Sequence, residues 1–292
     1  EVGIVFSMRS YLADWSASGK ATTKYSVDTI SGYYKMFWEE NIPVDIIHEE
    51  FFGELKDYKL IIIPNAMAIS PTIAEKLKEY IKNGGTVISG QSFGIFDETF
   101  KLSYTVPGYG YDKIFGGKED QLFLYDEISI VRDNVTYKIQ GNKYKETFKD
   151  VTGDVIFTYD DNTPAVFSNN YGRGKAYISG VNLGFAYSDR ELISDDILNE
   201  DKSNISSIGK DFVLYICKSI GVKGNICSAR DVKVSVIETD KEGIIILINS
   251  GENKAEGIIT LDKAYKNIEC VYESCTCSLD DDNNVKFIIN GD

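Results

Sequence analysis

Histidine is almost absent from this sequence, and its scarcity removes several kinds of chemistry. The one histidine among 292 residues is His48, which stands between Ile47 and Glu49. A zinc site takes several histidine or cysteine ligands, and no second histidine exists to build one with it. We interpret His48 as a surface or hydrogen-bonded side chain, and we expect the chain to bind no metal and no cofactor.

Cysteine is scarce as well, and its five copies all lie after Phe212. No two of them form a C-x-x-C pair, so their spacing indicates neither a zinc site nor a disulfide framework. Free thiols are the favoured state, and a bridge from Cys270 to either Cys275 or Cys277 is the alternative. A glutamine amidotransferase needs a cysteine at a sharp turn after an early strand, and the sequence excludes that activity because no cysteine stands there.

Long apolar runs and clusters of basic residues are missing too. No run approaches the roughly 20 residues that span a bilayer, and Glu1–Phe6 lacks the basic start and cleavage region of a signal peptide. We therefore expect no membrane partner, and a cytoplasmic location is favoured. The 31 basic and 45 acidic residues give a net charge of −14. This charge argues against a nucleic-acid partner, because phosphate binding requires clustered Lys and Arg.

What the sequence does contain is a clear strand, helix, strand unit over Asp57–Gly90. Its first strand is the apolar run Lys59–Pro64, which is typical of a strand buried on both faces of a parallel sheet. Ser70 as N-cap and Pro71 at the first helical position begin a helix with one apolar face. The second strand follows at Thr86–Ser89, so the unit predicts a right-handed crossover between parallel strands.

The residues before this unit predict another strand, helix and strand. Gly3–Ser7 is a buried strand, Ser26 can cap the next helix, and Val44–Ile47 is a second strand. The residues between the first strand and that helix, Met8–Tyr25, predict a polar connection that is unusually long. The order predicts an open, mostly parallel α/β sheet of the flavodoxin or amidotransferase type, with helices on both faces. Ligands of such sheets gather at the carboxyl ends of the strands, where the predicted connections are Met8–Tyr25, Asn65–Ser70 and Gln91–Gly110.

Shorter β-type runs follow, then a helix, then a region of strands alone. A tight turn at Tyr171–Gly174 leads into a strand at Lys175–Gly180, and Ser206–Ile220 predicts an amphipathic helix ended by Gly221. The last 65 residues or so predict a small antiparallel domain. Its five expected strands are Val232–Ile237, Ile244–Asn249, Gly257–Leu261, Ile268–Tyr272 and Val285–Ile289. We place an α/β domain at residues 1–224 and the small β-domain at residues 225–292.

The segment Gly90–Gly94 matches the nucleophile-elbow pattern G-x-S-x-G directly after a predicted strand. An elbow also needs a helix after the serine and a histidine later in the chain. Ile95–Glu98 does not begin a convincing helix, and His48 precedes Ser92. We therefore interpret the motif as a glycine-rich turn.

Acidic residues supply no better candidate. A glycosidase needs two carboxylates that face each other across a sugar, whereas sequence neighbours such as Glu39-Glu40 and Asp160-Asp161 point in different directions. Asp280, Asp282 and Asn284 imitate the start of a calcium loop but lack its glycine and its distal glutamate. A solvated hairpin turn is predicted there, and we assign no catalytic residue.

Several blocks of the sequence are similar, in order and spacing, to the middle domain of the glycoside hydrolase family 42 β-galactosidases. These blocks are Tyr33–Trp38, Asn41–Ile47, Tyr58–Pro64, Gly84–Ile88 and Gly94–Glu98. Tyr171–Ile178 resembles the turn and strand late in that domain, and the tail around Leu247–Asn249 resembles the small carboxyl-terminal domain. The acidic stretch Tyr187–Ser207 has no counterpart that we can align.

The resemblance implies an amidotransferase-like α/β domain without its catalytic residues, which mediates trimer formation. The chemistry would belong to a (β/α)8 barrel, which no part of this chain resembles, so no catalytic residue carries over. The expected partners are that barrel, in the same polypeptide or in a partner chain, and further copies of this chain. We expect the chain to be a piece of a longer polypeptide and the non-catalytic assembly region of a β-galactosidase-like glycoside hydrolase.

The competing interpretation is a free-standing carbohydrate-binding or carbohydrate-processing protein, with its site at the carboxyl edge of the sheet. Trp15, Phe93, Tyr109 and Tyr111 could stack on a sugar ring there. Aromatic residues near such loops more often pack in the core or form interfaces, so we prefer assembly. The residues expected at an interface or facing a sugar are Arg9, Trp15, Ser92, Phe93, Tyr109 and Tyr111.

Overall fold

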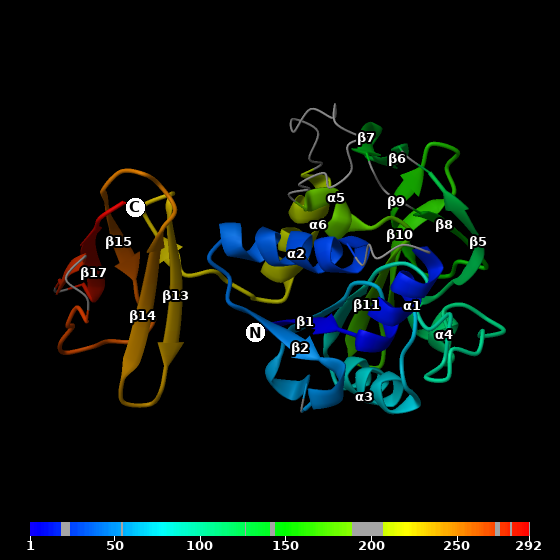
Figure 1. Cartoon of the computed structure of the whole chain (residues 1–292), viewed down its shortest axis with the longest axis horizontal. Coiled ribbons are helices and arrows are strands. Elements are labelled where there is room, and N and C mark those ends of the chain that lie inside the picture. The colour runs from blue at the N-terminus through cyan, green and yellow to red at the C-terminus, as the bar shows by residue number, and fades with distance from the viewer. Residues whose placement is uncertain are drawn as a thin grey trace. The chain divides into compact units, whose positions relative to one another are not determined.

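The chain divides into two compact units in the computed structural model (Figure 1). The structure describes residues 1–18, 24–53, 55–125, 127–140, 144–188, 207–271, 275–280 and 282–291. Unit 1 comprises Glu1–Met36 and Val44–Gly221, and unit 2 comprises Phe37–Pro43 and Val222–Asp292. Each unit has a hydrophobic core of its own. Among the described residues, no helix is both long and apolar enough to cross a membrane.

Unit 1 is built on a nine-stranded sheet with the order β2-β1-β3-β4-β11-β10-β9-β6-β7. Its parallel half consists of β1 (Val2–Phe6), β2 (Val44–His48), β3 (Leu60–Ile63), β4 (Thr86–Ser89) and β11 (Gly174–Ser179). Strand β11 pairs in parallel with β4. The order of these strands is the flavodoxin-type order. The predicted open, mostly parallel α/β sheet is therefore confirmed.

The other half of the sheet is antiparallel. It consists of β10 (Pro164–Tyr171), β9 (Asp154–Tyr159), β6 (Glu127–Arg132) and β7 (Val135–Gln140). A separate two-stranded ribbon pairs β5 (Lys118–Leu124) with β8 (Tyr144–Lys149). Strands β7 and β8 are additions to those that the sequence predicted.

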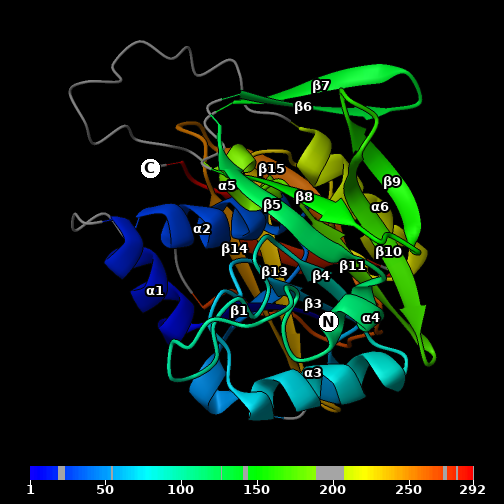
Figure 2. The same cartoon turned by 90° about the vertical axis from the view of Figure 1, so that its right-hand side faces the viewer.

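Helices cover both faces of the sheet, as Figure 2 shows for α3 below it and for α2, α5 and α6 above it. Their bounds are α2 (Lys24–Glu39), α3 (Pro71–Lys82), α5 (Leu183–Tyr187) and α6 (Ile208–Ser219). Helix α3 begins as predicted, because the Ser70 side chain accepts a hydrogen bond from the Ile73 N–H at 3.3 Å. A short helix α4 (Tyr111–Phe115) and two 3-10 turns, η1 (Glu49–Phe51) and η2 (Leu55–Asp57), complete unit 1.

Helix α1 (Met8–Ser18) corrects the prediction of a polar connection over Met8–Tyr25. The helix turns small and polar side chains inward, since Ser10, Ala13 and Asp14 are 2%, 6% and 3% exposed. Its large apolar side chains point outward. An ordinary surface helix shows the opposite arrangement, and for that reason the segment looked like a loop.

The start of helix α2 differs from the prediction as well. The helix already begins at Lys24, so Ser26 lies within it and is not its N-cap. The Ser26 hydroxyl instead donates a hydrogen bond to Asp14 Oδ2 at 3.1 Å. This contact joins α2 to the buried face of α1.

Unit 2 consists of short β-strands around a small core. Its strands are β12 (Ile226–Cys227), β13 (Val232–Glu238), β14 (Gly243–Asn249), β15 (Ala255–Thr260), β16 (Cys275–Leu279) and β17 (Asn284–Ile289). One sheet has the order β12-β15-β17-β16, and β13 pairs with β14 in a second. The strand predicted at Ile268–Tyr272 is wrong for residues 268–271, and Tyr272 lies outside the described residues. Strand β16 pairs with β17 instead.

Two smaller predictions also concern unit 2. The turn between β16 and β17 is an ordinary hairpin turn, in which Asp280 Oδ1 accepts the N–H groups of Asp282 and Asn284 at 3.1 and 2.9 Å.

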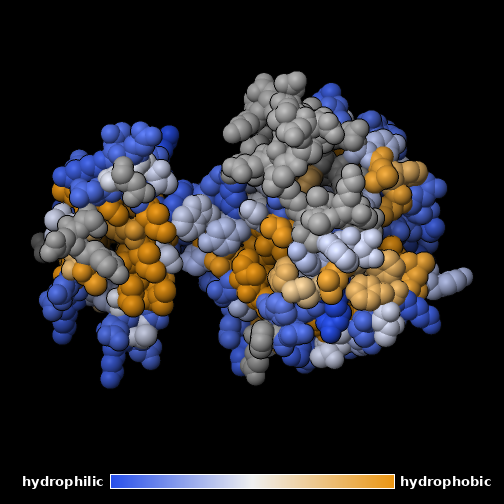
Figure 3. Space-filling model, viewed as in Figure 1, coloured by the Kyte–Doolittle hydropathy of each residue, from blue (hydrophilic) through white to orange (hydrophobic). Residues whose placement is uncertain are grey.

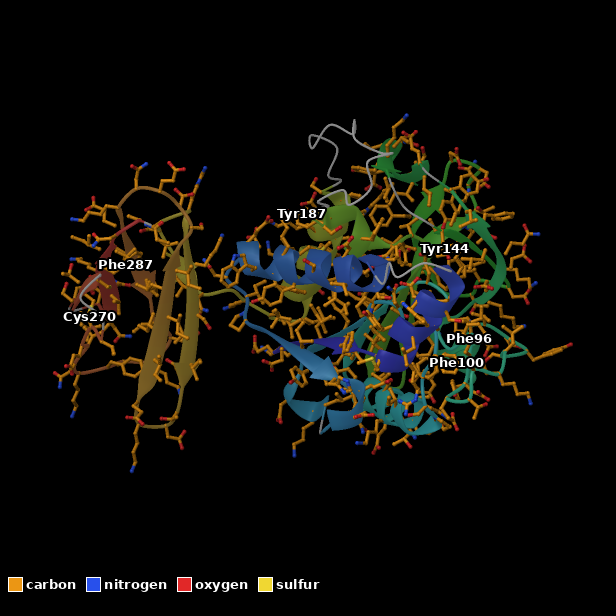
Figure 4. All side chains as sticks on the ribbon, in the orientation of Figure 1. Phe96, Phe100, Tyr144, Tyr187, Cys270 and Phe287 are labelled. Carbon is orange, nitrogen blue, oxygen red and sulfur yellow. The ribbon has the colours of Figure 1, made fainter. Side chains whose placement is uncertain are left out.

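The thiol of Cys270, labelled in Figure 4, lies 2.8 Å from the sulfur of Cys277 and 3.5 Å from that of Cys275. All five cysteines are free in this structure. The unaligned stretch Tyr187–Ser207 lies almost entirely outside the described residues.

Candidate functional site

The carboxyl edge of the parallel strands is where the sequence placed a site, and its central crevice is closed. In flavodoxin-type sheets the ligand lies between the ends of β1 and β3, where the strand order reverses. Here Ser10 Oγ accepts the Ala68 N–H and donates to the Ala68 carbonyl oxygen, each at 3.0 Å. Ser7 Oγ also lies 3.1 Å from that oxygen. The chain's own hydrogen bonds therefore occupy the position of a ligand.

The carboxylate of Glu49 anchors the start of α1 at this edge. It is 4% exposed, and its Oε2 accepts the Ser7 hydroxyl at 2.9 Å. Its Oε1 accepts the Arg9 N–H at 3.1 Å and pairs with the Arg9 guanidinium at 3.0 Å. Arg9, one of the expected interface residues, is thus used within unit 1 to fix the helix.

Ser92 has the backbone of a nucleophile elbow without the partners of one. Its φ is 56°, in the left-handed region, and its N–H donates to Glu146 Oε2 at 2.8 Å. His48 ends β2, which is separated from β4 by β1 and β3. In the part of the chain that the structure describes, the histidine is therefore on another strand than the turn, and the carboxyl group at the turn, Glu146, accepts the Ser92 N–H.

The sequence analysis missed two carboxyl groups near this turn. Glu146 on β8 is fully buried, Glu119 on β5 is partly buried near it, and burial raises the pKa of both. Burial, and then the neighbouring Glu119, raises the pKa of Glu146 well above its ordinary value. The alternation in Tyr144-Lys145-Glu146-Thr147-Phe148, which turns Glu146 and Phe148 inward, is the one signal that could have revealed it.

The expected aromatic platform does not form at this edge. Phe93 and Tyr111 are both 0% exposed, and their rings pack 4.5 Å apart in the core of unit 1. The Tyr111 hydroxyl donates to the Ala74 carbonyl at 2.7 Å. The Tyr109 hydroxyl donates to the Ile69 carbonyl at 2.8 Å, and partial burial raises its pKa to about 12. Of the four rings, Trp15 is the one exposed at its surface, at 51%.

What the edge does present is a set of outward apolar side chains. Met8, Leu12 and Trp15 follow one line along α1 and are 39%, 45% and 51% exposed. A neighbouring loop adds further exposed side chains, and Figure 3 shows orange atoms on this side of unit 1. We call the whole set the α1 surface; it comprises Met8, Leu12, Trp15, Phe100, Leu102 and Tyr104.

Backbone contacts join the loop to the helix. Ser10 of α1 is hydrogen-bonded to the backbone of Ala68. Ala68 forms a β-bridge with Phe96, and Phe96 forms another with Leu102. The rings of Phe96 and Phe100 lie 6.4 Å apart, and Figure 4 labels both. The loop that carries Phe100, Leu102 and Tyr104 is therefore tied to α1 through Ala68 and Phe96. Isolated apolar side chains on a surface are normal, whereas several of them on two joined elements are typical of a contact site.

A flavodoxin-type sheet whose carboxyl-edge crevice is bridged by the chain's own hydrogen bonds, with an apolar helix face turned outward, defines an α/β domain that presents a contact surface. Residues 1–200 match the family model of the β-galactosidase trimerisation domain, and the chain belongs to that family. The resemblance found in the sequence is confirmed, and the chain corresponds to the trimerisation domain of these enzymes.

The curated relatives that the chain matches are β-galactosidases as well. The chain is 34% identical over 197 residues to the β-galactosidase GanA of Bacillus subtilis, which covers 63% of this chain and 28% of GanA. It is 29% identical over 212 residues to the β-galactosidase Pbg of Clostridium perfringens, with 67% of this chain and 29% of Pbg covered. The chain thus spans less than a third of the length of these relatives.

Solved structures share the fold over nearly the whole chain. A catalytic mutant of Gan42B, a GH42 β-galactosidase from G. stearothermophilus, matches with a TM-score of 0.73 at 22% identity. That match covers 100% of this chain and 40% of Gan42B. The β-galactosidase from Bacillus circulans sp. alkalophilus matches with a TM-score of 0.71 at 17% identity, covering 99% of this chain and 41% of the other.

Proposed function

We propose that this chain joins copies of itself into a trimer through the α1 surface, as the assembly region of a β-galactosidase-like glycoside hydrolase. The observation that supports this most is the reversed polarity of the two faces of α1. The helix buries the polar Ser10 and Asp14 and exposes the apolar Leu12 and Trp15. Because Leu12 and Trp15 are about half exposed, leaving them uncovered forgoes about half of the roughly 1.5–3 kcal/mol that full burial of such a side chain provides. A partner that covers them recovers that free energy.

The catalytic part of the assembly is a (β/α)8 barrel, in the same polypeptide or in a partner chain. The length of the named β-galactosidases supports this, because the chain accounts for 28% of GanA and 29% of Pbg. We expect the chain itself to hydrolyse no galactoside, since among the described residues no histidine stands beside Ser92 and the Glu146 carboxyl group is fully buried. It positions the barrels and leaves the chemistry to them.

Light scattering coupled to size exclusion tests the assembly directly. The chain is expected to elute with three times its own mass, and the double variant Leu12→Glu, Trp15→Glu with the mass of one copy. Two buried charges in an apolar contact would each cost several kcal/mol, which exceeds what the contact provides. Leu124→Glu is the matched control, because Leu124 is 73% exposed on β5, outside the α1 surface.

Two results would contradict the proposal. One is a stable single copy at all concentrations together with turnover of a chromogenic galactoside by this chain alone. The other is a double variant that keeps the mass of the wild type, which would place the contact elsewhere on the molecule.

A further inference from the structure

A groove on unit 1 lies away from the α1 surface, between helix α6 and the antiparallel half of the sheet. Figure 2 shows α6 alongside β9 and β10. The groove has a volume of about 740 Å3 and is lined from β6, β9, β10, β11 and α6. This volume is in the range of small-molecule sites, which hold ligands in roughly 300–1,000 Å3.

The register of the sheet builds the floor of this groove. Ser168 on β10 pairs with Asp154 on β9 and with Tyr177 on β11. Residues directly opposite in a sheet point to the same face, so these three side chains form one row. The ring of Phe212 on α6 packs 5.8 Å from that of Tyr177, which fixes this face as the one beneath α6.

The floor contains a hydroxyl group without a partner. Ser168 is 1% exposed, and its Oγ makes no hydrogen bond within the part of the chain that the structure describes. A buried hydroxyl of this kind costs free energy unless a ligand or a bound water satisfies it. Because the Oγ is closed to solvent, Ser168 belongs to the floor beneath the groove and is not itself a contact for a ligand.

The wall of the groove offers an aromatic ring. Tyr215 on α6 is 62% exposed, and the Arg132 guanidinium lies 5.9 Å from the centre of its ring. The same guanidinium lies 5.5 Å from the ring of Phe157, so it is held across the end of the groove. Next to it, Asp133 and Asn134 form a tight turn with φ of 52° and 62° and point polar groups at the rim.

The charges at the rim balance. The described lining residues include two cations, Arg132 and Lys175, and two anions, Asp133 and Asp154, which sum to zero. A balanced rim gives no net attraction to phosphates or carboxylates. It supplies carboxylate acceptors and guanidinium donors, which are the partners that the hydroxyl groups of a neutral ligand need.

We propose that this groove binds a neutral saccharide of one or two pyranose units. The apolar face of a pyranose ring packs on the exposed ring of Tyr215, and its hydroxyl groups bond to Arg132 and Asp154. None of these side chains belongs to the α1 surface. The proposal is therefore independent of the assembly function.

Isothermal titration of the chain with lactose, galactose, glucose and maltose tests it. Saturable binding of at least one of these sugars is expected. Tyr215→Ala is expected to weaken that binding by about tenfold, because it removes the platform.

Tyr125→Ala is the matched control, because Tyr125 is 46% exposed and lies outside both the groove and the α1 surface. The affinity of this control variant for the sugar should equal that of the wild type. The proposal is overturned if none of the four sugars binds, if Tyr215→Ala binds as tightly as the wild type, or if glucuronate displaces the sugar at lower concentration than galactose does. None of these results depends on whether the chain forms a trimer.

Discussion

Glu146 shows how one buried side chain ties the stability of unit 1 to pH. It is 0% exposed, and its ordinary pKa is 4.5. Below that value both the folded and the unfolded chain hold the proton. Above it the unfolded chain releases the proton while the folded chain keeps it, because burial raises the folded pKa. The free energy of unfolding therefore falls as pH rises from 4.5 to the raised pKa.

The variant Glu146→Gln tests this link. The amide keeps an oxygen for the Ser92 N–H and does not ionise, so we expect the loss of stability with rising pH to shrink. One proton retained on folding changes the free energy of unfolding by up to about 1.4 kcal/mol per pH unit. Urea unfolding at a series of pH values between about 5 and 8 measures the slope for both proteins.

Glu79→Gln serves as the control, because Glu79 is exposed on α3. Its slope should match that of the wild type. Equal slopes for the wild type and Glu146→Gln would show that the retained proton is not held at Glu146.

At the scale of elements, the sequence predicted best where burial follows the usual pattern. Strands β3 and β4 and helix α3 are where the apolar runs and the Ser70 cap placed them. Helix α1 could not be found this way, because the rule that apolar residues face inward assigns it the wrong face. Met8, Leu12 and Trp15 do have helical spacing, which is the signal that was available. Strand β16 was missed because Cys, Thr and Ser give it little apolar character.

The candidate site was predictable in part. The sequence placed it at the carboxyl edge and named Trp15, which is indeed exposed there. It also named Phe93 and Tyr111, which belong to the core. Whether an aromatic side chain after a strand turns inward or outward depends on contacts with elements distant in sequence, such as that of Tyr111 with Ala74, and local pattern does not encode them.

The contact between α2 and α5 gives a prediction at this scale. A Cβ atom on Gly32 of α2 would overlap the carbonyl oxygen of Gly184 on α5. We expect Gly32→Ala to lower the stability of unit 1 by about 1–3 kcal/mol, although alanine is the better helix former. Thermal unfolding followed by circular dichroism measures the change.

Gly90→Ala is the comparison for this variant. A Cβ there would lie 3.6 Å from the nearest atom, the carbonyl carbon of Pro64, which is an ordinary contact. Its melting temperature should stay within a degree or two of the wild type. If Gly32→Ala is equally harmless, the two helices do not pack as closely as the structure has them.

At the scale of the whole molecule, charge opposes the proposed assembly. Each copy carries a net charge of −14, so three copies carry three times that charge, or −42. Like charges repel at long range, and salt screens the repulsion, whereas the apolar contact through α1 is little affected by screening. We expect the dissociation constant of the trimer to fall when sodium chloride is raised from about 20 to about 300 mM. Sedimentation velocity at both concentrations measures it, and a trimer that dissociates on adding salt would indicate a contact made by ion pairs.

The outward face of α1 also predicts how the strength of the assembly changes with temperature. Covering apolar side chains lowers the heat capacity, and the gain from covering them weakens on cooling. An assembly held by Met8, Leu12 and Trp15 should therefore loosen in the cold and tighten on warming, up to the temperature at which unit 1 itself unfolds. The helix that looked like a loop in the sequence would then make the number of copies in the assembly respond to temperature.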